Sequence, residues 1–412
     1  MRGTVTRPPA GHSAHDAHPR ALWRARQAPD RSAREGLEPN LLLHWFPARI
    51  SRASFSWSYS AWLGTVAGAL FLLLLLSGLP LLFLYVPSVE RAYQSMKDIE
   101  YVVTYGRWIR AVHRIAAQLM VIAVVLHLAR VFLTGAYKNS AGPGQHREWN
   151  WLIGVALLLL TLALSFTGYL LPWDQLAYWA VTVGTSIVSS VPAIGSRVRE
   201  LVIGGRAIGQ AALMRFYALH VLVLPAAFGL LFTYHMWRIR RDGGLAAADA
   251  VAEDLPGETV PGLISRVLTI TIGTFAAVSI LAGTITSPLG SPANPLMTPN
   301  PAKAPWYFLW LQEIVTDTTI RFGTFRANGA LVGGILLPGL LLGLLTAWPW
   351  LDRSPASSAG RWFARSRRAQ NVAFIVALAV MLALTCVALF LRGPFWELYW
   401  PWESWPEMPS RI

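Results

Sequence analysis

Four histidines in two apolar stretches have a spacing suited to holding a metal cofactor inside a membrane. His113 and His127 lie fourteen residues apart in the first stretch, and His220 and His235 lie fifteen apart in the second. Fourteen residues of helix span roughly 21 Å and bring the side chain back to within about 40° of its starting direction. Because a polar ring in lipid is costly, each histidine should face the protein interior and meet a partner.

The two stretches are expected to run in the same direction, because two crossings of the membrane separate them. His113 would then face His220 near the outer surface, and His127 would face His235 near the inner one. Two such pairs in a four-helix bundle make two six-coordinate, bis-histidine sites for non-covalently bound b-type haems. A lone intramembrane histidine is more often structural, but four at matched depths favour haem. Pro225 accounts for the extra residue in the second spacing, since proline kinks or unwinds a helix.

Two other apolar stretches carry glycines at the same spacing. Gly64 and Gly78 are fourteen residues apart, and so are Gly154 and Gly168. Glycine removes the side chain that would strike the wide haem macrocycle. Ordinary packing of small residues between helices is the alternative, but the equal spacing favours clearance for haem.

Arginines near the histidines are candidates to bind the haem propionates, because a guanidinium fits a carboxylate bidentately. Topology signals are the alternative, and they suit Arg240 well, since it follows an apolar stretch. They suit Arg110 and Arg114 poorly, because these two flank His113 on the outer side. The candidates are Arg110, Arg114, Arg130 and Arg240.

Composition places the chain in a membrane. Of its 412 residues, 54% are hydrophobic and 14% are charged, and its 19 tryptophans suit belts at two membrane interfaces. The net charge of +14 does not indicate nucleic-acid binding, because Lys and Arg gather in the N-terminal tail and between apolar stretches, the positive-inside pattern. Seven stretches have about 20 apolar residues each, enough to span a bilayer. They are residues 60–86, 111–136, 149–171, 213–237, 264–286, 329–350 and 370–391.

We therefore predict an all-α integral membrane protein, with a four-helix dihaem bundle followed by a three-helix module. The polar, Gly- and Pro-bearing residues after the fourth stretch indicate a linker. The tryptophan-rich C-terminus predicts an outer-side assembly surface, which could also lie at the lipid headgroups. The expected parts are a polar tail and interfacial segment (1–56), the dihaem domain (57–242), the linker (243–262), the three-helix domain (263–392) and the tail (393–412).

Four motifs give the chain a family resemblance. They are "WIRAVHR" (Trp108–Arg114), "RVFLTG" (Arg130–Gly135), "FTGYLLPWDQLAYWAV" (Phe166–Val181) and "RFYALHVLVLP" (Arg215–Pro225). With the histidine spacing, they resemble cytochrome b of the bc-type complexes. The resemblance is closest to the chloroplast and cyanobacterial form, whose four-helix cytochrome and three-helix subunit IV are separate chains. Here the two look fused.

The resemblance implies a subunit of a quinol:electron-acceptor oxidoreductase. Quinol would be oxidised at the outer side, with one electron passing to a Rieske iron–sulfur protein and the other through both haems to a quinone at the inner side. It also implies c-type cytochrome partners, a dimeric complex in membrane lipid, and a bacterial inner membrane as the location.

One departure from the family affects the outer quinol site. The family carries P-E-W-Y there, whose acid is thought to accept a quinol proton, whereas this chain has Ala304-Pro305-Trp306-Tyr307. Trp306 and Tyr307 keep the shape of the site, but Pro305 cannot accept a proton. Glu313 is the better substitute and Asp317 the second. The alternative is that both acids merely face water.

A second departure concerns a further haem. The chloroplast-type form has a cysteine two residues before the first spaced glycine, and it holds an extra haem covalently. Here that position is Trp62, and the single cysteine, Cys386, lies far along the chain. One cysteine also excludes an intramolecular disulfide and a c-type attachment motif. No covalent haem is therefore expected.

Three alternatives remain open. A cytochrome b-like conduit could link the quinone pool to a different outer redox partner, without ordinary outer-site quinol oxidation. A secondary transporter could use the histidines as proton relays, but the matched spacing argues against it. A structural scaffold subunit would have no use for four paired ligands.

Overall fold

The computed structural model describes residues 49–50, 55–139, 145–242, 244–246, 258–322 and 325–406. Most of the predicted N-terminal tail (1–56) and most of the predicted linker (243–262) therefore lie outside the described residues. The end of the predicted C-terminal tail, from residue 407, lies outside them as well.

Seven helical segments in the described part of the chain are long and apolar enough to cross a membrane, which confirms the predicted all-α membrane fold. A helix satisfies its own backbone hydrogen bonds, as the hydrocarbon core requires. Four segments are single helices: α4 (Leu63–Leu84), α6 (Gly106–Thr134), α7 (Arg147–Leu170) and α13 (Val260–Thr284). The other three contain a π-helical turn: α10 (Gln210–Ala218), η2 (Leu219–Val223) and α11 (Leu224–Arg241); α15 (Gly329–Leu331), η3 (Val332–Leu336) and α16 (Leu337–Leu351); and α17 (Arg368–Cys386) with η6 (Val387–Leu391).

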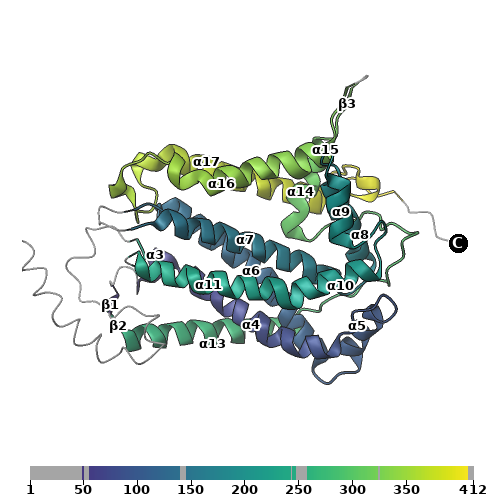
Figure 1. Ribbon diagram of the computed structural model, residues 1–412, viewed down its shortest axis with the longest axis horizontal. Helices are drawn as coiled ribbons and strands as arrows, with labels where there is room; N and C mark the ends of the chain where they lie inside the picture. The colour runs from purple at the N-terminus through teal and green to yellow at the C-terminus, as the bar shows by residue number, and fades with distance from the viewer. Residues whose placement is uncertain are drawn as a thin grey trace, which may run out of the picture.

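Shorter elements lie beyond the long helices. Four helices gather at one end of the bundle, here called the outer end, and α3 (Trp57–Ser60) lies at the opposite, inner end (Figure 1). The four are α5 (Ala92–Tyr101), α8 (Gln175–Ser189), α9 (Gly195–Ile203) and α14 (Trp306–Asp317). Short helical turns are η4 (Ala356–Ser358), η5 (Arg365–Arg367) and η7 (Pro394–Trp396). Two antiparallel pairs of short strands complete the set: β1 (Arg49–Ile50) with β2 (Glu258–Thr259), and β3 (Arg321–Phe322) with β4 (Phe325–Arg326).

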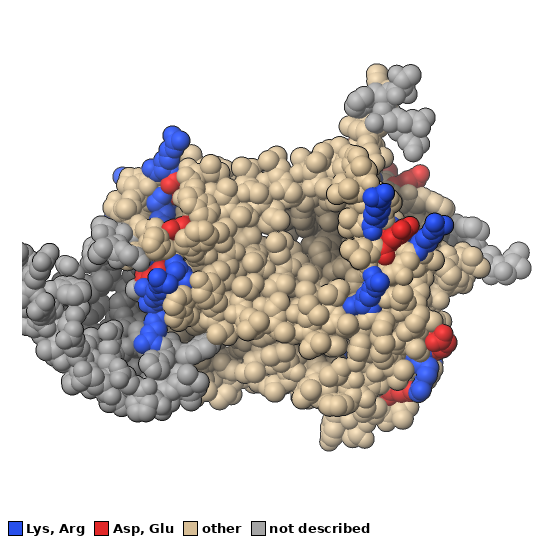
Figure 2. Space-filling model, viewed as in Figure 1, with Lys and Arg blue, Asp and Glu red and all other residues tan. Residues whose placement is uncertain are grey.

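The long helices lie side by side in layers. Helices α16 and α17 form one layer, α6, α7 and α11 lie in the middle, and α4 and α13 lie on the far side of the middle layer (Figure 1). Charged side chains gather at the two ends and leave an uncharged band between them in the view of Figure 2. Such a band is what a protein in contact with lipid chains must present.

One buried cluster at the centre of the bundle brings together side chains of α4, α6, α7, α11 and α13. Leu70 and Leu73 of α4 pack with Ala116 of α6, Phe228 of α11 and Val278 of α13. The small Ala116 lets neighbouring helix backbones approach closely. This packing fixes the relative depth of α6 and α11, the two helices that carry the histidines.

A second set of contacts, here called the inner latch, ties the four-helix part to the last two membrane helices. Its members are Tyr137, Lys138, Asp352 and Arg367. The fully buried Arg367 donates to Asp352 Oδ2 at 3.1 Å and to the Tyr137 hydroxyl at 2.7 Å. Tyr137 in turn donates to Asp352 Oδ2 at 2.6 Å, and Lys138 Nζ lies 3.3 Å from the same oxygen.

The inner latch holds Asp352 as a carboxylate. Burial by itself would raise the pKa of Asp352, but hydrogen bonds from Ser354 and Tyr137 and the charge of Lys138 hold that pKa below its ordinary value. A lowered folded-state pKa means that the carboxylate stabilises the fold above the unfolded pKa of about 3.9. That contribution is lost as the pH falls through the folded pKa.

Substituting Asp352 should therefore loosen the last two helices. Asp352→Asn leaves the Arg367 guanidinium buried without its counter-charge, which we expect to cost about 3 kcal/mol. Thermal unfolding of the detergent-solubilised protein at pH 7 should begin at a lower temperature than in wild type. The surface substitution Glu90→Gln is the control and should leave the transition in place. An unchanged transition in Asp352→Asn would show that the inner latch is not what joins the two parts.

Candidate functional site

The four histidines meet in two pairs across the bundle. The ring centroids of His113 and His220 are 6.2 Å apart, and those of His127 and His235 are 6.4 Å apart. The ring planes are nearly perpendicular in both pairs, at 77° and 80°. The sequence-predicted pairing therefore holds in the fold, with α6 supplying one ring of each pair.

The π-helical turn η2 explains why the second spacing is one residue longer. Pro225 lies two residues after this turn and has no N–H to donate to the preceding turn of helix. A π-helical turn takes in one more residue than an α-helical turn. His220, which lies within η2, is thereby brought onto the same face as His235 despite the fifteen-residue spacing.

Hydroxyl groups orient the outer pair of rings. Ser77 Oγ donates to the Leu73 carbonyl at 2.7 Å, so its oxygen is available to accept from His113 Nδ1 at 3.0 Å. Thr167 Oγ1 donates to the Ala163 carbonyl at 2.8 Å and faces His220 Nδ1 at 3.2 Å. This arrangement favours the tautomer with its proton on Nδ1, which leaves Nε2 with a free lone pair.

Each of the four spaced glycines faces one histidine ring. A Cβ atom at Gly168 would lie 2.4 Å from His220 Cε1, which is a clash. At Gly78 and Gly64 the corresponding distances, to His113 and His127, are 3.1 and 3.2 Å, and at Gly154 the distance to His235 is 3.8 Å. The glycines thus make room for the imidazoles themselves, a role that the sequence did not suggest.

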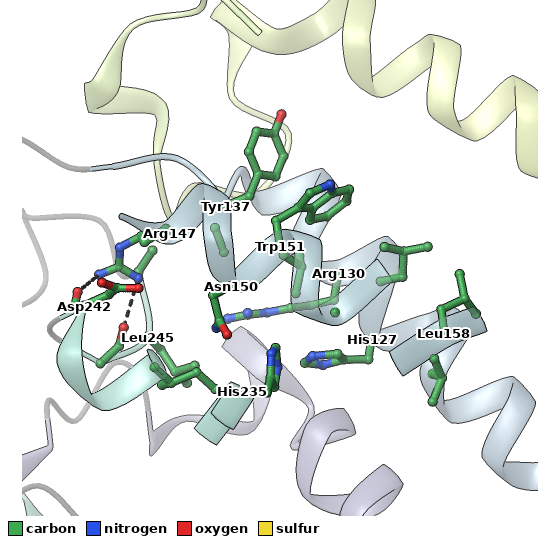
Figure 3. A pocket seen from close by; sticks show the side chains of 18 residues that line it. His127, Arg130, Tyr137, Arg147, Asn150, Trp151, Leu158, His235, Asp242 and Leu245 are labelled. Atoms are coloured by element: carbon green, nitrogen blue, oxygen red, sulfur yellow. Dashed lines mark hydrogen bonds between the residues drawn. The ribbon is translucent and has the colours of Figure 1, made fainter. Parts of the chain in front are cut away.

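A pocket opens beside the inner pair, with an empty volume of about 750 Å³ that includes space open to the surface. His127 and His235 point toward one another in it, and Arg130 runs alongside them (Figure 3). Arg130 donates to the Tyr59 carbonyl at 3.3 Å and lies over the Tyr59 ring. Its Nη2 and the Asn150 Oδ1 are buried without a hydrogen-bond partner in the described part of the chain. These two groups are placed to bind a polar ligand.

A second arginine at this pocket was missed by the sequence analysis. Arg147 lines it, donating to the carbonyls of Gly244 at 2.9 Å and Asp242 at 3.0 Å (Figure 3). The predicted Arg240 does not line it, and the buried arginine nearby is Arg238, which is paired with Asp242. The signal available in the sequence was an arginine two residues before the third apolar stretch.

The outer arginines are engaged by the protein. Arg110 forms an ion pair with Glu100 at 2.5 Å and donates to the Ser287 carbonyl at 2.8 Å. Arg114 donates to the Pro288 carbonyl at 3.1 Å. Both therefore tie α6 to the loop after α13, and their predicted contact with propionates remains a prediction.

Trp306 and Tyr307 open helix α14 close to α6 and α7. Trp306 Nε1 donates to Gln118 Oε1 of α6 at 2.5 Å. Burial raises the pKa of Tyr307 to about 12, although Ser165 of α7 and Arg114 act to lower it. Figure 2 shows a hollow in the surface between the layer of α16 and α17 and the middle layer, near this end. The two aromatic residues thus stand at the outer end of the bundle, where α14 meets α6.

Glu313 does not face this region as a free carboxylate. It is almost fully buried, and Arg392 Nη2 and Nε donate to its Oε1 at 2.6 and 3.0 Å. Asp317 lies 3.4 Å from the same guanidinium and is half exposed. The geometry does not support the predicted role of Glu313 as an unengaged proton acceptor, because its charge is already taken up by an arginine.

Trp62 stands at the position where the chloroplast-type resemblance implies a cysteine. It is buried, it contacts Phe55 edge-to-face at a centroid distance of 5.4 Å, and the Arg266 guanidinium lies 5.9 Å from its ring. Cys386 is exposed on α17. An aromatic and cationic cluster therefore occupies this part of the inner end.

Comparison with known proteins accounts for both halves of the chain. Residues 50–243 match the family described as Cytochrome b/b6/petB, and residues 292–397 match Cytochrome b(C-terminal)/b6/petD. Cytochrome b6 of Synechococcus sp. (strain JA-3-3Ab) is 40% identical over 181 residues, which are 44% of this chain and 81% of that protein. Cytochrome b6 of Gracilaria tenuistipitata var. liui is 39% identical over 181 residues, with the same shares covered.

A solved structure shows the same fold over nearly the whole chain. It is titled "Hyperthermophilic respiratory Complex III", and the match covers 90% of this chain and 89% of that chain, with a TM-score of 0.66 and 22% identity. Together with the seven membrane helices, these likenesses bear out the resemblance read from the sequence. The chain belongs to the cytochrome b/b6 family, as a multi-pass, haem-binding electron-transport protein of the bc type that carries the b6-like and subunit IV-like parts together.

Proposed function

We propose that this protein is the dihaem cytochrome b subunit of a quinol-oxidising complex in a bacterial inner membrane. The observation that carries the proposal is the pair of facing imidazoles at each of two depths. The complex would include a Rieske iron–sulfur protein and a c-type cytochrome, would be dimeric, and would act as a translocase between an outer quinol site and an inner quinone site.

The spacing of the rings fits iron ligation. A metal ion bound between the two imidazoles of a pair, at about 2 Å from each nitrogen, would need the ring centroids to lie about 6 Å apart. The observed values are 6.2 and 6.4 Å. Haem bound at both pairs would supply one-electron carriers at two depths of the membrane. The protein's part is to hold each Nε2 lone pair toward the metal position, as Ser77 and Thr167 do for the outer pair.

Buried polar groups fit the propionates of the inner haem. Arg130 Nη2 needs an acceptor, and a guanidinium pairs readily with a carboxylate. We propose Arg130 and the neighbouring Arg147 for this role in preference to Arg240. Arg110 and Arg114 keep their proposed place at the outer haem, where Arg114 has donors beyond the one given to Pro288.

At the outer site, Trp306 and Tyr307 would bind the quinol ring between α14 and the bundle. Tyr307 presents a protonated phenol at neutral pH, since the pKa of Tyr307 is raised, so it can donate to a quinone oxygen or to a quinol hydroxyl. Glu313 is unsuited to receive the quinol proton while Arg392 holds it. The proton would therefore leave by a group other than Glu313.

A second candidate function is favoured by one observation. Pro305 occupies the place of the family's acid, and Glu313, the nearest buried carboxylate along α14, is already ion-paired. A chain so altered could still conduct electrons between the quinone pool and a different outer redox partner, without ordinary quinol oxidation at the outer site.

Steady-state turnover separates the two functions. The purified complex should reduce cytochrome c with decylubiquinol as donor, and an outer-site inhibitor should abolish this activity. Haem that is reduced only from the inner site, with no inhibitor-sensitive reductase activity, would favour the second function. Absence of any b-type haem spectrum would reject both.

The glycine contacts predict an asymmetry between two alanine substitutions. Gly168→Ala places a Cβ against His220 and should reduce outer-haem occupancy several-fold, because the imidazole must move from its ligating position. Gly154→Ala makes only an ordinary contact with His235 and should retain the inner haem. Reduced-minus-oxidised spectra of the two purified variants measure this. Equal loss in both would mean that the glycines clear the macrocycle and not the histidine rings.

A further inference from the structure

The C-terminal segment lies against the loop and helix of the outer site. Lys303 Nζ donates to the Leu389 carbonyl at 2.7 Å, and its ammonium lies 6.0 Å from the Trp405 ring centre. The Phe395 backbone N–H donates to Asn300 Oδ1 at 2.5 Å. Residues 389–405 are here called the strap. Both ends of the strap, Leu389 and Trp405, contact the loop that precedes α14.

Arg392 fastens the strap to the helix itself. Its guanidinium makes three hydrogen bonds to Glu313 and one to Asp317, and it also donates to the Trp396 carbonyl at 3.1 Å. Arg392 is 8% exposed and Glu313 only 1%. Because a charge buried this deeply is costly unless paired, the position of each partner is determined by the other.

Movement at Glu313 would be transmitted to the outer site. Tyr307 precedes Glu313 by six residues on the same helix, which is about 9 Å along a rigid rod. The preceding loop is tied to the same helix, because Gln312 accepts from the Ala304 N–H at 3.0 Å and donates to the Ala302 carbonyl at 2.8 Å. The strap, the loop and α14 thus form one hydrogen-bonded unit.

We propose that the strap is a positioning element of the outer quinol site and that Arg392, through Glu313, is its positioning residue. The inference rests on the proposed function in that the ligand positioned is a quinol. It assigns Glu313 a role different from proton transfer: the carboxylate anchors α14. Trp306 and Tyr307 depend on this anchor for their distance from α6 and α7.

A double-mutant cycle in the assembled complex tests the assignment. Arg392→Gln and Glu313→Gln should each raise the KM for decylubiquinol by roughly fivefold or more, because each leaves a buried charge without its partner. Arg392→Lys should do so less, since it keeps the charge but not the bidentate geometry. The double variant Glu313→Gln/Arg392→Gln should have a lower KM than either single variant. Arg91→Gln, at an exposed arginine of the outer end, serves as the matched control.

Two further readouts make the test decisive. Hydrogen–deuterium exchange of residues 300–317 should rise in each single variant and fall again in the double, while both haem spectra are retained. A fall in kcat for Glu313→Gln with a shifted pH profile, matched in the double variant, would show instead that Glu313 carries a proton and would overturn the proposal. Unchanged KM and exchange in Arg392→Gln would overturn it too. If wild-type complex with both haems fails to oxidise decylubiquinol, the proposed function fails, and the exchange data alone then decide whether the strap holds α14.

Discussion

An imidazole inside a membrane must find a partner, and the structure of this protein is arranged around that requirement. Four rings enter the apolar core of the bundle from α6 and from the η2–α11 segment, and each faces a ring on the opposite helix. The cost of placing polar rings in hydrocarbon is met only if all four are paired at matched depths. Helix direction, helix register and the π-helical turn before Pro225 all serve this pairing.

Helices α4 and α7 flank the two histidine pairs: α4 lies against the rings from α6, and α7 lies against the rings from the η2–α11 segment. Each brings two glycines against the histidine rings, and each brings one hydroxyl residue immediately before its outer glycine, Ser77 and Thr167. The residues before the inner glycines are Leu63 and Ile153. The outer pair of rings is therefore oriented by side-chain hydroxyls, whereas the inner pair lies beside the polar pocket of Arg130 and Arg147. The two histidine pairs thus have different surroundings at their two depths.

The sequence predicted the parts of this structure that have a period, because helix geometry converts spacing into direction and depth. The seven membrane helices, the histidine pairing and the effect of Pro225 belong to this class. The contacts that it missed join residues far apart in the chain, such as Arg367 with Tyr137 and Arg392 with Glu313. A carboxylate after an apolar run is compatible with a proton acceptor or an ion pair. Only the fold shows that Arg392 has already taken up the charge of Glu313.

We propose that two haems are each held by one histidine from α6 and one from the η2–α11 segment. Redox-resolved visible spectra of four single variants of the purified complex test it most directly. Wild type should carry two b-type components per chain. His113→Ala and His220→Ala should each lose the same component, and His127→Ala and His235→Ala should each lose the other. Loss of different components in His113→Ala and His220→Ala, or a single haem per wild-type chain, would contradict the account.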